Sequence, residues 1–163
     1  SDPDIRPILS WLLGGFISAQ WNHTLMILLY FIPAALIVMA YGKILNVLQL
    51  DEEHASQLGV NVEHTKMLLI VAATLSTAAA VSYSGLIGFV GLVAPHAVRL
   101  MWGNDYRFLL PMSAIMGAAF LVLADLAART VASPGELPVG IVTAFCGAPF
   151  FLYLLRRRKS FSL

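Results

Sequence analysis

The stretch that decides the fold is Met67–Val98, MLLIVAATLSTAAAVSYSGLIGFVGLVAPHAV, which has no aspartate, glutamate, lysine or arginine in 32 residues. A helix needs about 20 apolar residues to cross a bilayer, so this run is too long for one span and too short for two full spans with a loop. We predict a helix from Lys66 to about Tyr83, a tight glycine-rich turn, and a shorter helix to about Trp102. The residues that break the run are Ser82, Ser84, Gly85, Gly88 and Gly91.

Three other apolar runs have the length of a membrane span: Thr24–Tyr41, Phe108–Ala128 and Leu137–Leu155. Pro33 predicts a kink in the first of them. Ile8–Gln20 is too short to cross, and tryptophans of the kind found at membrane interfaces flank it. We expect a short helix there, packed at one membrane face. The predicted fold is all-α, a polytopic transmembrane helical bundle of about five spans.

The composition agrees with a membrane protein. Of the 163 residues 59% are hydrophobic and 12% are charged, whereas soluble domains average about 45–50% apolar and about 25% charged residues. The single cysteine, Cys146, excludes an internal disulfide and a cysteine-based zinc site. The acidic start, Ser1–Asp4, lacks the basic region of a signal peptide and is expected to be a loop within a longer protein.

Basic residues are divided unequally between the two sides that alternating spans create. Eight lie on the side of the C-terminus, and two, Arg6 and Arg129, lie on the other. Cytoplasmic loops carry such an excess of positive charge. We therefore predict a cytoplasmic C-terminus, external residues 1–20, and five crossings between them. The eight are Lys43, Lys66, Arg99, Arg107, Arg156, Arg157, Arg158 and Lys159.

The longest polar segment, Gly42–Lys66, lies on the predicted cytoplasmic side. Asp51 and Asn61 are suitable helix N-caps, and Gly59 stands where a helix would end. The pattern predicts two short helices, at about 51–58 and 62–66. A connector between spans can be much shorter, so a folded polar loop indicates a protein-docking site; a solvated connector is the alternative.

Motifs for chemistry are absent from the sequence. The stretch Gly85–Gly91 is neither GxGxxG nor GxxxxGK[ST] and follows a membrane helix rather than a strand. Its glycines are expected to allow a tight turn and close helix approach. His96, after Pro95, is expected to pack with a hydrogen bond to a backbone carbonyl rather than to bind a metal. No catalytic set, metal site, cofactor or nucleic-acid partner is expected.

Asp125 and Arg129 are the only charges of the fourth predicted span. Ionisable residues in membrane helices are functional candidates by default, but an acid four residues before a base can also pair with it on one helix face. Arg129, at the external end, could instead meet an external acidic partner. Glu136 follows in the external loop, and Pro138 with Gly140 is expected to shape the start of the last helix.

Several ordered motifs resemble those of the FecCD family, the permease subunits of ATP-binding cassette (ABC) importers for iron–siderophores, haem, cobalamin and, in some members, molybdate. Residues 85–99, GLIGFVGLVAPHAVR, are similar to the signature GxIGFVGLVxPHxxR. Residues 104–107 resemble its short polar loop, 124–129 its AD…AR helix, and 136–150 its ELPVG…GAPFF end. Leu45-Asn46 and Leu58-Gly59-Val60 resemble the LN…LGV of its cytoplasmic loop. The signature positions are Gly85, Gly88, Gly91, Pro95, His96, Arg99, Asp125, Glu136, Pro138 and Gly140.

The resemblance implies a transport permease of the bacterial cytoplasmic (inner) membrane that is not itself an enzyme. Two permeases of about ten spans pair, as a homodimer or a heterodimer, two cytoplasmic ATPase subunits hydrolyse ATP, and an external or periplasmic binding protein delivers the cargo. Arg129 would receive an acidic residue of that protein, and Ile8–Gln20 would be the short external helix beside the path. Residues 43–66 would be the coupling loop that docks on the ATPases, through Asp51, Glu52, Glu53, Ser56, Leu58, Gly59 and Val60.

The sequence departs from the family pattern in two ways. Asp51 stands where the family usually has glycine, and Ser56 where arginine is common. The family's first five spans are also missing, so the chain is expected to be the C-terminal half of a permease: a truncated chain, a gene fragment or one piece of a split protein. Its expected divisions are an external segment with a short helix (1–23), a span (24–42), the coupling loop (43–66), and four spans with a tail (67–163).

The predicted function is import of a metal chelate, with iron–siderophore or haem first and cobalamin or molybdate as alternatives. An ion-coupled secondary transporter is a rival, but it would want ionisable residues at mid-membrane and inverted repeats. Only Asp125 is a candidate, and it lies near a helix end. A membrane enzyme has no catalytic set to support it. A fragment that is inactive alone is compatible with the first hypothesis.

Overall fold

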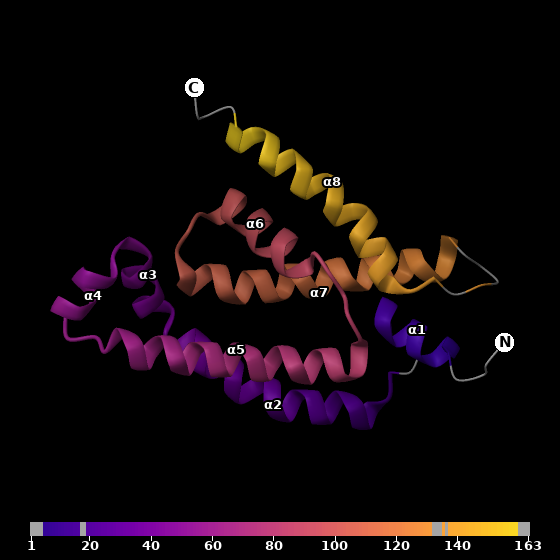
Figure 1. Cartoon of the computed structure of the whole chain (residues 1–163), viewed down its shortest axis with the longest axis horizontal. Helices are drawn as coiled ribbons and strands as arrows, with labels where there is room; N and C mark the ends of the chain where they lie inside the picture. Colours follow the sequence, from indigo (N-terminus) through magenta and orange to yellow (C-terminus); the bar gives the residue numbers. More distant parts are fainter. Residues whose placement is uncertain (1–4, 17–18, 132–134, 136, 160–163) are drawn as a thin grey trace.

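The structure, a computed structural model, describes residues 5–16, 19–131, 135 and 137–159 (Figure 1). The described residues form α-helices joined by turns and short connections, and no strand occurs among them. The helices are α1 (Ile5–Leu13), α2 (Trp21–Ala40), α3 (Gly42–Leu50), α4 (Glu52–Gln57), α5 (Val62–Ser84), α6 (Val90–Trp102), α7 (Tyr106–Val131) and α8 (Val139–Lys159).

Four of these helices, α2, α5, α7 and α8, are long and apolar enough to cross a membrane. Helix α6 has 13 residues and is therefore about 20 Å long at 1.5 Å per residue, shorter than the roughly 30 Å hydrocarbon core of a bilayer. The all-α polytopic bundle of about five spans is confirmed, with α6 as a short fifth member.

The helices pack as two pairs, α2 with α5 and the short α6 with α7, and α8 crosses the second pair (Figure 1). Gly117 of α7 faces α6, and a Cβ there would meet Val90 Cγ1 at 3.5 Å and Ala94 Cβ at 3.6 Å, which is ordinary van der Waals contact. Helices α3 and α4 lie at one end of the bundle with the first turns of α5 and α7, and we call this the α4 end. Helix α1 lies at the opposite end with the last turn of α5 and the first of α8, and we call this the α1 end (Figure 1).

Most large apolar side chains on these helices are exposed. Within the 18-residue hydrophobic windows of the four long helices, only 6–17% of residues are buried. In lipid, such apolar faces need no covering by the chain itself, and small residues rather than large ones mark the close helix contacts. The buried positions Ala34, Ala72, Ala94, Ala124 and Ala128 have this character.

The helices at the α4 end differ from the predicted pair. A further helix, α3, occupies residues 42–50, which had been included in the polar loop. The predicted short helix at 62–66 is instead the start of α5, which continues without a break to Ser84. The Asn61 side chain accepts a hydrogen bond from the His64 backbone N–H at 3.1 Å, and no glycine or proline after this cap ends the helix before the apolar run.

Three glycines bring α1 against the ends of α5 and α8. A Cβ at Gly85 would lie 2.0 Å from the Trp11 carbonyl oxygen, and one at Gly140 would lie 2.0 Å from that of Leu13. Gly14 has a φ of +70° and is equally crowded, 2.5 Å from the Leu86 carbonyl oxygen. Only glycine fits such contacts between backbones. We call Gly14, Gly85 and Gly140 the glycine junction.

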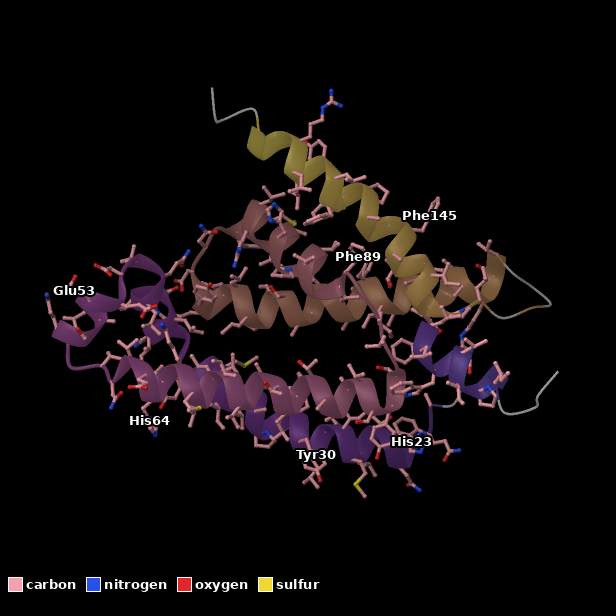
Figure 2. The ribbon with its side chains drawn as sticks, viewed as in Figure 1. His23, Tyr30, Glu53, His64, Phe89 and Phe145 are labelled. Atoms are coloured by element: carbon pink, nitrogen blue, oxygen red, sulfur yellow. The ribbon has the colours of Figure 1, made fainter. Side chains whose placement is uncertain are left out.

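Gly88 and Gly91 do not share this role. A Cβ on either would meet nothing within 4 Å, so the structure supports the predicted close approach for Gly85 and contradicts it for these two. The turn between α5 and α6 instead has Phe89 in the left-handed region, at φ 67°. The Phe89 side chain lies over Gly147 of α8, where a Cβ would be 2.3 Å from Phe89 Cβ (Figure 2).

Candidate functional sites at the two ends of the bundle

The segment Asp51–Val60, which we call the docking segment, is a short helix with defined ends. Asp51 has extended backbone after α3, and its Oδ1 accepts a hydrogen bond from the Glu53 backbone N–H at 3.1 Å. This is the side-chain cap expected of aspartate at a helix start. The departure from the family's usual glycine therefore strengthens the cap of α4.

The docking segment ends in the turn predicted for Gly59. Gly59 has a φ of +83°, and its N–H donates to the Ser56 carbonyl at 3.0 Å while the Val60 N–H donates to the Ala55 carbonyl at 3.2 Å. These two bonds form a Schellman motif, which closes a helix C-terminus with glycine in the left-handed region. Both ends of the segment are therefore closed by hydrogen bonds within the segment itself.

The outward face of the docking segment is polar with one apolar residue. Leu58 is 72% exposed whereas Ala55 is fully buried. Glu52 forms an ion pair with Lys66 in the first turns of α5, and Glu53 lies at the far tip of the α4 end (Figure 2). The Ser56 hydroxyl donates to the Glu53 carbonyl at 2.7 Å. The surface thus presents acidic side chains around an exposed leucine, a combination suited to a protein partner.

A pair of residues that sequence reasoning did not connect joins α3 to α7. The Asn46 side chain donates through Nδ2 to Asp105 Oδ1 at 2.7 Å and accepts through Oδ1 from the Tyr106 backbone N–H at 2.8 Å. Asp105 also accepts from the Arg107 N–H at 2.9 Å, so it caps α7. Both residues stand in motifs that resemble the family, Asn46 in LN and Asp105 in NDYR, but nothing in either motif indicates that the two residues meet.

The hydrogen bond from Asn46, followed by that from the Arg107 backbone, lowers the pKa of the Asp105 carboxyl. Hydrogen bonds to a carboxylate favour its charged form. Gly42, one turn before Asn46 on the same face of α3, also packs on α7, since a Cβ there would lie 3.5 Å from Arg107 Cα. Helix α3 is therefore fixed to the start of α7 over a full turn.

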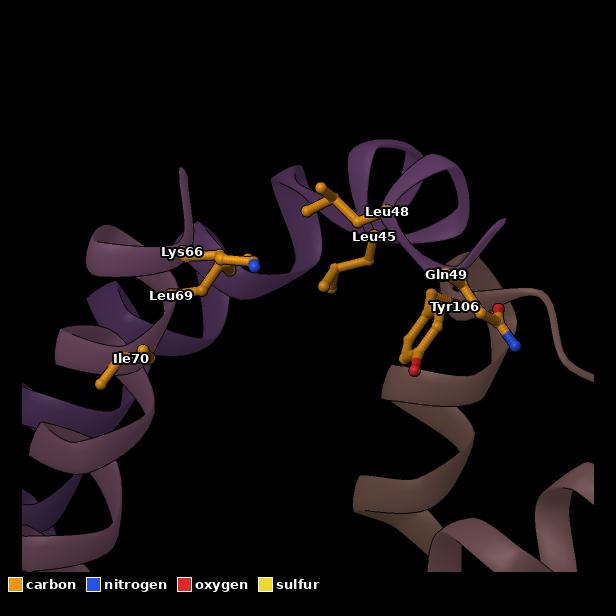
Figure 3. A pocket seen from close by; sticks show the side chains of 7 residues that line it. All are labelled: Leu45, Leu48, Gln49, Lys66, Leu69, Ile70 and Tyr106. Carbon is orange, nitrogen blue, oxygen red and sulfur yellow. The ribbon is translucent and has the colours of Figure 1, made fainter. Parts of the chain in front are cut away.

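An open groove of about 280 Å³ separates α3 from α5 at this end (Figure 3). Its walls come from three helices, so the docking segment is connected to the bundle through α7 on one side and through the Glu52–Lys66 pair on the other. The lining residues are Leu45, Leu48, Gln49, Lys66, Leu69, Ile70 and Tyr106.

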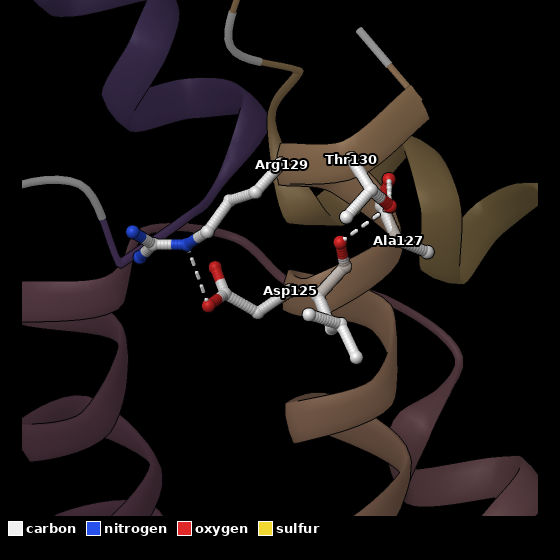
Figure 4. A network of polar contacts seen from close by, with 5 residues as sticks. Asp125, Ala127, Arg129 and Thr130 are labelled. Carbon is white, nitrogen blue, oxygen red and sulfur yellow. Dashed lines mark hydrogen bonds and ion pairs between the residues drawn. The ribbon is translucent and has the colours of Figure 1, made fainter. Parts of the chain in front are cut away.

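At the α1 end, Arg129 and Asp125 form the pair that their spacing predicts. Arg129 Nε donates to Asp125 Oδ2 at 2.8 Å (Figure 4). The side chain of Arg129 is 57% exposed and that of Asp125 is 26% exposed. The two terminal nitrogens of the guanidinium point away from Asp125 (Figure 4) and have no partner among the described residues. The ion pair therefore leaves the two terminal nitrogens of Arg129 available as hydrogen-bond donors to another molecule.

The turn that bears Arg129 is anchored in the bundle. Ala124, Ala128 and Val139 form a buried cluster. Phe16, Leu121, Leu137 and Val142 pack on it, so the end of α7 contacts both the start of α8 and the segment after α1. Arg129 is consequently held on a rigid support next to the glycine junction.

The other signature residues lie in α6 and at the start of α8. His96 makes an edge-on contact with Phe150, with ring centroids 5.9 Å apart, and no hydrogen bond from it to a backbone carbonyl is found in the described part of the chain, contrary to expectation. Arg99 lies exposed in the last turn of α6. The Pro138 carbonyl accepts from the Ile141 N–H at 3.1 Å, so it helps to begin α8, whereas Glu136 lies outside the described residues.

No group of three or more histidine, cysteine, aspartate or glutamate side chains that could hold a metal is found in the part of the chain that the structure describes. Polar chemistry in the bundle is instead concentrated at its two ends, with a folded acidic loop at one and a paired arginine at the other. This arrangement is suited to binding other proteins.

Comparisons with known proteins give the family. The FecCD transport family matches residues 1–157. The chain is 51% identical over 159 residues to a cobalamin import system permease of Halobacterium salinarum, covering 98% of the chain and 42% of the relative. It is 40% identical to a hemin transport system permease of Yersinia pestis, covering 97% and 47% respectively.

A solved structure supports the same family. An ABC transporter described as being of the metal-chelate type, in an inward-facing conformation, matches with a TM-score of 0.88 and 35% identity over 96% of this chain and 51% of the other. The chain spans about half the length of the curated relatives it matches. With its apolar spanning helices and a family match over nearly its whole length, the chain belongs to the FecCD transport family and is a multi-pass protein of the cytoplasmic (inner) membrane.

Proposed function

We propose that this chain forms part of the permease of an ABC importer that carries a metal chelate into the cytoplasm. The observation that carries the proposal is the placement of two binding surfaces at opposite ends of one bundle. The docking segment is folded and exposed at the α4 end, and Arg129 is exposed at the α1 end. An importer driven by separate ATPases needs one contact on each side of the membrane.

The docking segment is proposed to bind the cytoplasmic ATPase subunits. Its support is a defined shape, from the Asp51 cap to the turn at Gly59, and an outward surface of Glu52, Glu53 and Leu58. The excess of basic residues predicts that this end is cytoplasmic. ATP hydrolysis is assigned to the partner, and this chain transmits its conformational change.

Arg129 is proposed to receive a carboxylate of the external binding protein. Because Asp125 binds Nε, the two terminal nitrogens remain for an end-on contact, and a paired fork of donors matches a carboxylate better than a point charge does. A second copy of the permease, identical or related, is proposed to complete the path across the membrane.

The proposed cargo is a large metal chelate, with an iron–siderophore or haem first. Cobalamin is the second candidate, since a permease named for cobalamin import is 51% identical to this chain. Molybdate is the third.

The test is ATP-dependent uptake by the complete transporter, reconstituted in vesicles with its ATPases and binding protein. Parallel arms use labelled ferric siderophore, hemin, cobalamin and molybdate. Uptake of one chelate that requires ATP on the side of the membrane where the ATPase subunits are bound supports the proposal. Uptake driven by an ion gradient without ATP would replace it with the secondary-transporter reading.

A further inference from the structure

Helix α7 connects the two proposed binding surfaces along a single element. It begins at Tyr106, next to α3, and ends at Val131, just beyond Arg129. Its 26 residues make it about 39 Å long at 1.5 Å per residue. Pro111 in its second turn removes one backbone hydrogen bond, and no other proline interrupts the helix from there to Arg129.

The α1 end of α7 is fixed by packing. Ala124 and Ala128 are buried in one cluster with Val139 of α8. Arg129 Nε is bonded to Asp125 on the same helix. The guanidinium therefore moves together with this end of α7.

The α4 end of α7 is fixed both by packing, at the buried Leu109 and where Gly42 meets Arg107, and by polar contacts. Asn46 uses both atoms of its amide there, Nδ2 to Asp105 at 2.7 Å and Oδ1 from the Tyr106 N–H at 2.8 Å. Asp105 is ionised at neutral pH, so the first of these is a charge-assisted bond, which is stronger than a bond between neutral groups. Helix α3 also contacts α2, which it follows directly after Tyr41, whereas the open groove separates it from α5.

We propose that Asn46 and Asp105 form a latch that joins the docking segment to α7, so that α7 carries the signal between the ATPase side and Arg129. Asn46 is a positioning residue: its side chain faces α7 rather than the docking surface, and it acts through α7. The latch rests on the proposed function, because it assigns a route between the two surfaces proposed there.

The test uses the complete transporter, with the ratio of ATP hydrolysis in the presence of loaded binding protein to hydrolysis in its absence as the readout. Asn46→Ala is expected to lower this ratio roughly 5- to 10-fold, a coupling effect in the usual range for one or two lost bonds. Gln49→Ala is the matched control, since Gln49 is an exposed amide one turn further along α3 with no hydrogen bond to α7 among the described residues, and it is expected to keep the wild-type ratio.

A charge exchange tests whether the effect belongs to this pair of residues. Asn46→Asp places two carboxylates together and is expected to lower the ratio at least as far as Asn46→Ala. The double variant Asn46→Asp with Asp105→Asn again places one amide donor opposite one carboxylate acceptor. It is expected to recover at least half of the wild-type ratio. Basal ATP hydrolysis and Tm are measured on the same variants, because a transporter that is only destabilised would lose both along with the ratio.

The outcomes are distinct. Wild-type transport with an unchanged ratio in Asn46→Ala, or a double variant no better than Asn46→Asp alone, overturns the latch and leaves the proposed function standing. A wild-type transporter with no ATP-dependent uptake overturns the proposed function and the latch with it.

Discussion

Substitution of Gly140 by alanine tests the glycine junction, because the added Cβ would lie 2.0 Å from the Leu13 carbonyl oxygen and 3.2 Å from that of Leu86. Carbon and oxygen atoms that are not bonded do not approach within about 3 Å, so one backbone must move by about 1 Å. Both obstacles are backbone atoms, and no side-chain rotation relieves them. Overpacking of this kind costs about 1–3 kcal/mol, which for a domain of this size corresponds to a Tm lower by about 2–12 °C.

The assay is thermal unfolding of the purified protein in detergent, followed by tryptophan fluorescence. Trp11 is a local reporter, because its indole N–H donates to the Ser82 carbonyl across the junction at 3.2 Å. Gly88→Ala is the matched control, since a Cβ there meets nothing within 4 Å, and its Tm is expected to stay within about 2 °C. Equal Tm values for Gly140→Ala and Gly88→Ala would refute the account of the junction.

Four further predictions concern the two ends. Reversing charge at Glu52 and Glu53 with lysine is expected to lower transport-coupled ATP hydrolysis while membrane insertion, measured by fractionation, stays normal; unchanged coupling would remove the docking assignment. Arg129→Glu is expected to weaken capture of the loaded binding protein at least tenfold in a pull-down titration, and normal affinity would return Arg129 to a structural role. The lowered pKa of Asp105 means that its contribution to stability is complete above about 3.9, the ordinary carboxyl pKa, and is lost as pH falls through the lowered folded-state value. The protection factor of the Tyr106 amide, which is its intrinsic exchange rate divided by its observed rate at the same pH, should therefore fall only in strong acid, and a fall near pH 6 would contradict this. Replacing the cap Asn61 with alanine should cost about 1 kcal/mol, measured as a lower Tm.

The sequence predicts those features that depend on neighbouring residues. The spans follow from runs of apolar residues, and the caps at Asp51 and Asn61 and the turn at Gly59 follow from side chains that bond to their own local backbone. The Asp125–Arg129 pair follows from their spacing on one helix. Each of these is decided within a few residues, where the geometry of a helix is known in advance.

Features that depend on distant residues were missed. Asn46 and Asp105 are 59 residues apart, and only the packing of α3 on α7 brings them together. The crowding at Gly14 and Gly140 involves α1, α5 and α8 at once, and a glycine in sequence does not show what opposes it. Helix α3 was missed because Lys43, Asn46 and Gln49 make its sequence resemble a polar loop, although one face of it packs on α7.

Both docking assignments depend on which end of the bundle is cytoplasmic, and thiol labelling in cells measures this sidedness most directly. In the complete protein with Cys146→Ala, single cysteines replace Ser56 in the docking segment and Gly135 between α7 and α8. A membrane-impermeant thiol reagent is expected to label the cysteine at 135 in intact cells or spheroplasts, and the cysteine at 56 only in inside-out vesicles. Labelling of the cysteine at 56 from outside, with protection of that at 135, would contradict the account.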